Sequence, residues 1–374
     1  MKKFVTACIV IGIGAVGAGV SFADEDQDRG KDNEKDKVVI RDAVQRFATL
    51  PDGVRHPEGI TANPANGDIY ASTFDAPPGN NPNKLLRWDR NGKLVALRDF
   101  GNEPLLGLDF DRHNQKVYVL NVGAFAGGKS RVQRIAANFS ASTVVEDVAF
   151  LPSIGAPTPR TVANPDGTSD TITFGNVVSV PNAMVFDSHG NLYVSDSFQG
   201  AIFRVDNAAS CKTPCPMVTV AHDPLLATAG FPPFGANGLA LSGDESVLFI
   251  ANTGDDRVLA LTLGTSRISV FTDGIDGADG LAVDGKGRLW VAANQADTVF
   301  QLNEHGRVVG KVGEFRGIRA DGTPDGLLFP ASMVFVGDSM FVTNLAIALT
   351  PAIGDEPEED VTRWTLSRVK VPGL

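Results

Sequence analysis

The amino-acid sequence predicts an all-β fold, a six-bladed β-propeller with four antiparallel strands in each blade. One pattern recurs six times in the 374 residues: two apolar strands joined by a turn rich in Asp, Gly and Asn. Each copy is followed by two further strand-like runs and by no helical pattern. Glycine contributes 40 residues, as expected of a chain with many short turns.

The repeated hairpins and their outer strands define six units. The hairpins cover 57–73, 104–121, 181–197, 236–252, 278–294 and 330–344. Outer strands follow them, for example 201–206 with 217–221, and 257–263 with 267–274. One longer unit carries an insertion at 152–178, rich in Pro, Gly and Thr, which could be a lid over the channel.

The two ends of the repeat region indicate how the propeller closes. The last unit ends with the strand 362–371 and is one strand short of four. The segment 43–53 resembles the outer strands 94–101 and 308–315, yet it precedes the first hairpin. We therefore predict that this N-terminal strand completes the last blade, and that 41–374 form a single domain.

The N-terminal segment predicts export. Lys2 and Lys3 precede an apolar stretch over 5–20, and Ser21-Phe22-Ala23 provides small residues for cleavage. Residues 1–23 are thus interpreted as a bacterial signal peptide rather than a membrane anchor, which implies a periplasmic or secreted protein. The charged segment 24–40 is expected to be a disordered tether.

Charge narrows the choice of partners. Cleavage would remove two lysines and no acid, taking the formal net charge from −11 to −13. Nucleic acid is therefore disfavoured, because binding phosphates requires a basic face. We expect a small-molecule substrate, no membrane association after cleavage, and a monomer.

Three cysteines are too few for a disulfide scaffold or a cysteine-rich metal protein. Cys8 lies in the predicted signal peptide. Cys211 and Cys215 lie in the loop between the outer strands of blade 3, where an oxidising compartment would allow a small disulfide. A structural bond is favoured over a redox pair, which more often has Cys-x-x-Cys spacing.

Polar residues recur where the inner strands begin. The first strand of each blade lines the channel of a propeller, so we compare six positions: Glu58, Leu106, Asn182, Asn237, Asp279 and Ser332. Carboxylate and amide oxygens are the ligands that Ca²⁺ prefers. Mn²⁺ and Mg²⁺ are alternatives. Zn²⁺ is the least favoured ion because the candidate ligands include no sulfur and no imidazole. Alternatively, these residues bind channel waters and hold turns. Gly59, Gly238 and Gly280 follow three of them and predict close backbone approach.

These residues carry a family resemblance. The segments 236–258 and 278–299 resemble repeats of the gluconolactonase/regucalcin (senescence marker protein-like) family, and Pro-Glu-Gly-Ile at 57–60 resembles its metal-binding glutamate motif. The resemblance implies that Glu58, Asn182, Asn237 and Asp279 bind one divalent cation. Paraoxonases, strictosidine-synthase-like proteins and NHL-repeat proteins share the blade pattern. The family's sugar-binding arginine and glutamate on blade 2 have no clear match.

The predicted function is an exported, divalent-metal-dependent hydrolase of lactones or related esters, in which the metal polarises the carbonyl and activates water. Asp279 is the candidate for proton transfer. His56, Ser332 and Phe234 are candidate substrate-binding residues, although His56 could equally cap the turn before the first strand. The sequence after the predicted signal peptide contains no Gly-x-Ser-x-Gly motif, which disfavours a serine hydrolase. The alternative is a non-catalytic propeller that binds a ligand or protein.

Overall fold

The computed structural model describes residues 39–41, 43–76, 82–175 and 178–371. The predicted signal peptide and nearly all of the predicted tether lie outside these residues. Among the described residues, no helix combines the length and apolar character needed to cross a membrane.

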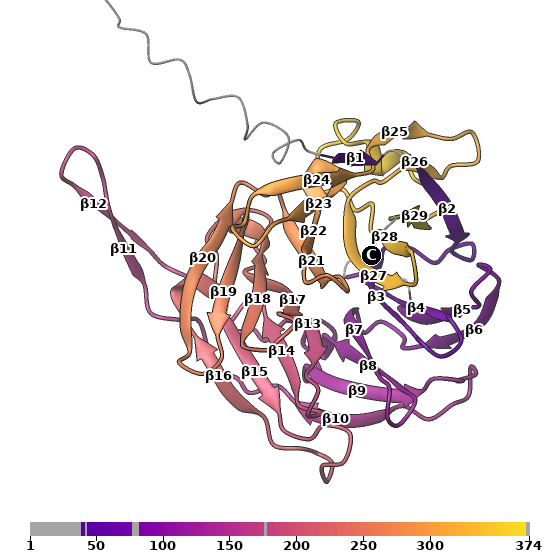
Figure 1. Cartoon of the computed structure of the whole chain (residues 1–374), viewed down its shortest axis with the longest axis horizontal. Coiled ribbons are helices and arrows are strands. Elements are labelled where there is room, and N and C mark those ends of the chain that lie inside the picture. Colours follow the sequence, from indigo (N-terminus) through magenta and orange to yellow (C-terminus); the bar gives the residue numbers. More distant parts are fainter. Residues whose placement is uncertain (1–38, 42, 77–81, 176–177, 372–374) are drawn as a thin grey trace, which may run out of the picture. The chain divides into compact units, whose positions relative to one another are not determined.

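The described chain forms six blades of four antiparallel strands each, one of them extended by a fifth strand, which confirms the predicted propeller (Figure 1). Blade 1 comprises β3 (Pro57–Ala62), β4 (Ile69–Thr73), β5 (Lys84–Trp88) and β6 (Leu94–Asp99). Blade 2 comprises β7 (Leu105–Asp111), β8 (Lys116–Asn121), β9 (Arg131–Ala136) and β10 (Glu146–Phe150). Blade 3 comprises β13 (Pro181–Phe186), β14 (Leu192–Asp196), β15 (Ala201–Val205) and β16 (Val218–His222).

Blade 4 comprises β17 (Ala236–Leu241), β18 (Val247–Asn252), β19 (Arg257–Thr262) and β20 (Arg267–Asp273). Blade 5 comprises β21 (Ala278–Val283), β22 (Leu289–Ala293), β23 (Thr298–Leu302) and β24 (Val308–Val312). Blade 6 comprises β27 (Pro330–Val336), β28 (Ser339–Asn344), β29 (Thr365–Lys370) and β2 (Val44–Thr49). The innermost strands contact one another in a closed cycle, β3 to β7, β13, β17, β21, β27 and back to β3.

The N-terminal strand closes this cycle as predicted. Strand β2 pairs antiparallel with β29, from Val44 opposite Val369 to Thr49 opposite Thr365. The last blade is therefore built from both ends of the repeat region, and the outer edge of β29 is paired.

Several elements lie outside the repeat. Strand β1 (Val39–Arg41) pairs parallel with β24 of blade 5. Two extra hairpins are β11 (Arg160–Ala163) with β12 (Ser169–Ile172), and β25 (Phe315–Ile318) with β26 (Pro324–Gly326). Short 3-10 turns occur at η1 (Gly123–Ala126), η2 (Pro224–Leu226), η3 (Thr253–Asp255), η4 (Asn294–Ala296) and η5 (Pro357–Asp360).

The hydrophobic core lies between neighbouring blades. Strands β4 and β14 are buried along their whole length, whereas the outer strand β20 alternates between exposed and half-buried residues. One apolar cluster joins blades 5 and 6 through Val44, Trp290, Val312 and Val369. Because both faces of an inner strand are covered by other blades, these strands are buried even where they carry polar residues.

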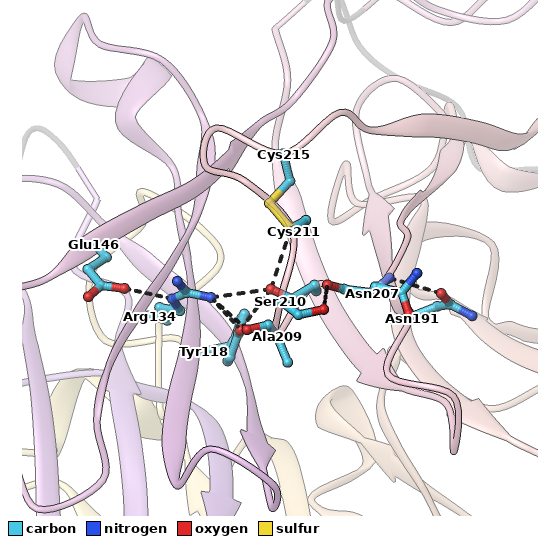
Figure 2. Close-up of a disulfide and its surroundings, with 10 residues drawn as sticks. Tyr118, Arg134, Glu146, Asn191, Asn207, Ala209, Ser210, Cys211 and Cys215 are labelled. Carbon is cyan, nitrogen blue, oxygen red and sulfur yellow. Dashed lines mark hydrogen bonds and ion pairs between the residues drawn. A yellow bond between two sulfur atoms is a disulfide. The ribbon is translucent and has the colours of Figure 1, made fainter.

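A disulfide joins Cys211 and Cys215 in the loop between β15 and β16, with the Cα atoms 5.7 Å apart (Figure 2). The loop also contacts blade 2: the Cys215 N–H donates to the carbonyl of Val148 at 2.7 Å. Arg134 of β9 donates to the Ala208 and Ala209 carbonyls and to Glu146. The disulfide therefore lies in a loop that links blades 2 and 3.

Candidate metal centre and channel mouth

Each inner strand has a β-bulge at its channel residue. In blade 1, Pro57 pairs with Thr73 and Ile60 pairs with Ala71, so Glu58 and Gly59 together lie opposite Ser72. The same register shift follows the first residue of β7, β13, β17, β21 and β27. A bulge redirects a side chain out of the regular alternation.

The register corrects one of the predicted equivalences. In blade 6, Pro330 pairs with Asn344 and Met333 with Val342, so Ala331 occupies the position of Glu58. Ser332 takes the position of Gly59, and its N–H donates to Thr343 Oγ1 at 2.9 Å. The prediction was wrong by one residue because Pro-Ala-Ser lacks the glycine that marks this register in four of the other five hairpins.

The predicted close approach after the channel residues is present. A Cβ atom on Gly59 would lie 2.4 Å from the Leu106 carbonyl oxygen, and one on Gly238 would lie 2.1 Å from that of Asp279. Neighbouring inner strands therefore pack backbone against backbone, which brings side chains from several blades together at the channel.

The predicted ligands are buried and present oxygen atoms without partners. Glu58, Asn182, Asn237 and Asp279 are at most 5% exposed and line the same cavity. Within the described part of the chain, Glu58 Oε2, Asn182 Oδ1 and Asp279 Oδ1 have no hydrogen-bond partner. Asn294 Oδ1, from the same cavity, also has no partner among the described residues. Because buried polar atoms are normally satisfied, these acceptors form a donor set that fits a bound cation.

Three side chains that the sequence reasoning missed hold the ligands in place. Asn182 Nδ2 donates to Ser197 Oγ at 3.0 Å, and Asn237 Nδ2 donates to Thr253 Oγ1 at 2.8 Å. Asn294 Nδ2 donates to Asp279 Oδ2 at 3.1 Å. The sequence does contain a signal for these three side chains, because each lies about 15 residues after the ligand that it contacts, at the end of the second strand of the hairpin.

Burial shapes the electrostatics of the two carboxyl groups. Burial and the charge of Asp279 hold the pKa of Glu58 well above its usual range. Burial raises the pKa of Asp279 to about 7, although the hydrogen bond from Asn294 opposes this rise. Two buried acids with adjacent amide oxygens are a donor set that fits a hard divalent cation.

The described residues contain no cluster of three or more His, Cys, Asp and Glu side chains suited to a metal. The site instead combines two carboxylates with two amides. This composition agrees with the predicted ligand set and disfavours Zn²⁺, which prefers nitrogen and sulfur.

The ligands form the floor of a cavity of about 80 Å³. Thr253 and Asn294 complete the polar floor. The other described lining residues are apolar and form the wall: Phe74, Leu106, Pro232, Phe234, Phe329, Leu345, Ile347 and Leu349. The candidate residue Phe234 is thus in the cavity, whereas none of the described residues of 152–178 lines it.

Two other candidate residues lie elsewhere. His56 does not line the cavity; its Nδ1 lies 3.2 Å from the Leu345 carbonyl, and its own carbonyl accepts the N–H of Phe74. His56 has a φ of 52° and packs edge-on against Trp364, which agrees with the alternative of a turn-capping role. Ser332 lines a second cavity on the other side of the ligands.

The fold and the oxygen-lined channel define a six-bladed propeller with a candidate cation site. Residues 228–313 match the family described as SMP-30/Gluconolactonase/LRE-like region. The chain is therefore a six-bladed propeller in which residues 228–313 resemble this family, and the predicted resemblance is confirmed over that segment.

Curated relatives include the lactonase drp35 of Staphylococcus epidermidis, which is 28% identical over 144 residues. That match covers 34% of this chain and 40% of the relative, so the chain spans about two fifths of the lactonase's length.

Two solved structures share the fold. A luciferin-regenerating enzyme has a TM-score of 0.61 at 14% identity, covering 88% of this chain and 95% of that one. Regucalcin of Agrobacterium tumefaciens, described as a calcium-binding protein, has a TM-score of 0.57 at 15% identity, covering 90% and 97%.

Proposed function

We propose that this chain is a divalent-cation-dependent hydrolase of lactones or related esters. The observation that carries the proposal is the set of three partnerless oxygens, Glu58 Oε2, Asn182 Oδ1 and Asp279 Oδ1, on the floor of an apolar cavity. The partial similarity to lactonase drp35 supports the reaction class.

Glu58, Asn182, Asn237 and Asp279 would hold the cation. When bound there, a divalent cation supplies a Lewis acid that polarises an ester carbonyl. Ser197 and Thr253 fix the amide nitrogens of the two asparagines, which leaves their oxygens to face the site. Ca²⁺ is the preferred ion because all four ligands offer oxygen, and regucalcin is described as calcium-binding.

Asp279 is the proposed proton-transfer residue. Burial raises the pKa of this carboxyl in the cation-free protein, and a cation bound beside it would lower that pKa and keep the carboxylate ionised as a proton acceptor. Its Oδ2 is held by Asn294, while its Oδ1 has no partner within the described residues. Export remains part of the proposal and rests on the N-terminal segment.

Metal analysis and a substrate panel test the proposal. Protein beginning at Asp24 is assayed for bound metal, then for hydrolysis of lactones and aryl esters with Ca²⁺, Mn²⁺, Mg²⁺ or EDTA. We expect bound calcium and activity that EDTA abolishes. Asp279→Ala should abolish activity, whereas Asp244→Asn, in an exposed hairpin turn, should not.

The non-catalytic alternative makes a different prediction. If a cation raises the melting temperature, no ester or lactone is hydrolysed, and Asp279→Ala changes only stability, the propeller is a binding module. If no cation raises the melting temperature, the proposed cation site is wrong as well.

A further inference from the structure

We propose that the substrate is an uncharged lactone or ester with an apolar chain or ring, and that this apolar part lies against one side of the channel mouth. This inference rests on the proposed function, and it adds the chemical class and the orientation of the substrate.

The residue that follows the second strand of each blade is polar in three consecutive blades and apolar in the other three, which gives the channel mouth a polar half and an apolar half. In blades 3, 4 and 5 this residue is Ser197, Thr253 or Asn294, each hydrogen-bonded to a ligand. In blades 6 and 1 it is Leu345 or Phe74, which line the cavity, and in blade 2 it is Val122, which is buried but is not part of the lining. The polar half therefore supports the cation ligands, and the apolar half can receive only a nonpolar group.

The apolar side is supported by a cluster of aromatic rings. Phe234 lies 6.4 Å from Phe74 and 5.5 Å from Phe198, measured between ring centroids. Phe125 lies 6.4 Å from Phe74 and 6.1 Å from Phe198. The rings come from blades 1, 2 and 3 and from the loop that joins blades 3 and 4, so this aromatic wall extends beyond blades 6, 1 and 2 and exists before a substrate binds.

The described wall residues offer no side-chain donor or charge to a substrate. A polyhydroxylated sugar lactone would bury hydroxyl groups without partners, which opposes its binding. An anionic substrate would meet no cationic side chain among the described lining residues and would approach Glu58 and Asp279. An uncharged apolar group avoids both costs.

A homologous substrate series tests this inference. Five-membered lactones with alkyl tails of increasing length are compared with gluconolactone under identical cation conditions. We expect kcat/KM to rise by about fourfold per methylene while the tail stays within the cavity. Equal or faster hydrolysis of gluconolactone would overturn the inference and leave the hydrolase proposal intact.

A matched pair of variants locates the effect. Phe234→Ser should lower kcat/KM for a long-tailed lactone by about tenfold or more, with little change for the unsubstituted lactone. Phe231→Ser is the control, because Phe231 belongs to the same loop but is 60% exposed and does not line the cavity. Equal losses for both substrates in Phe234→Ser would contradict the inference.

Binding provides a readout that does not require catalysis. Alkyl-substituted five-membered lactams, which the enzyme should hydrolyse poorly, are titrated into the calcium-loaded protein by calorimetry. Affinity should rise with tail length and fall in Phe234→Ser. If no lactone is hydrolysed but this pattern holds, the hydrolase proposal fails and the apolar site stands. Affinity independent of tail length would overturn the inference.

Discussion

Single hydrogen bonds orient the amide ligands. The Asn182 side chain donates from Nδ2 to Ser197 Oγ, and Ser197 in turn donates to the Ala236 carbonyl at 2.8 Å. Thr253 performs the same two functions for Asn237 in blade 4, with the Ala278 carbonyl as its acceptor. A hydroxyl at this position thus fixes which amide atom faces the channel and also links two blades.

We predict that Ser197→Ala weakens calcium binding about tenfold to a hundredfold, because Asn182 loses the partner that orients it. The lost bonds should also lower the free energy of unfolding by about 1–3 kcal/mol. Calorimetric titration with Ca²⁺ and urea unfolding in EDTA measure the two effects. Ser197→Thr is the control, since Thr253 shows that threonine can fill this role. Unchanged calcium affinity in Ser197→Ala would show that the ligand does not need this support.

The backbone contact at Gly238 gives a second prediction at this scale. A methyl group there would lie 2.1 Å from the carbonyl oxygen of Asp279, so Gly238→Ala must separate blades 4 and 5. We expect a loss of at least about 2 kcal/mol in unfolding free energy. Gly243→Ala is the comparison, because its methyl would meet no described atom within 4 Å. Equal unfolding midpoints for the two variants would contradict close packing of these strands.

Among the elements, the segment after β28 contributes Leu345, Ile347 and Leu349 to the cavity and is held from η5. The Glu356 carboxylate accepts the N–H groups of Leu349 and Thr350. Burial, together with the charges of Asp297, Glu356 and Glu359, raises the pKa of the neighbouring Glu358 to about 7. The apolar wall is therefore attached to Glu356, two residues before the carboxyl group whose pKa is raised.

This shift predicts a pH-dependent stability. Below about pH 4.5 Glu358 is protonated in both the folded and unfolded states, so its full contribution is present. As the pH rises toward 7 the unfolded state ionises first, and stability is lost. Glu358→Gln should therefore raise the melting temperature by about 1–2 °C at pH 8 and leave it unchanged at pH 4, the effect being small because solvent screens this half-exposed group.

Differential scanning calorimetry across this pH range measures the effect. Glu304→Gln, at an exposed position in a blade 5 turn, is the control and should change neither value. A Glu358→Gln variant that is less stable than the parent protein at pH 8 would show that the ionised Glu358 carboxylate does not destabilise the fold.

The elements also show how far the sequence determines the fold. The blade count, the inner strands and the closure by 43–53 follow from alternation and turn residues, which are local signals. Strand β1 and the β25–β26 hairpin carry no repeat signal and were not predicted. The error at Ser332 arose because a bulge changes register without changing composition. Ser197, Thr253 and Asn294 were missed because their role depends on pairing between strands.

In the propeller as a whole, closure by β2 makes every blade a neighbour of two others. Strand β2 belongs to blade 6, but its Val44 packs into the apolar cluster that includes Trp290 and Val312 of blade 5. The N-terminal strand therefore contributes both to its own sheet and to the contact between two blades. Because the cycle of inner strands is closed, loss of this contact leaves two blade faces exposed.

We predict that Val44→Asp destabilises the whole propeller by at least about 3 kcal/mol, since an unpaired charge would enter the apolar cluster between blades 5 and 6. Gln45→Asp is the matched control: residue 45 is exposed and lies opposite Arg368, which would accommodate the acid. Urea unfolding gives the free energies, and hydrogen exchange shows which strands open. If faster exchange in Val44→Asp is confined to β2 and β29, closure stabilises only blade 6. If it spreads through the inner strands of all blades, the closing strand maintains the geometry that holds the four ligands together.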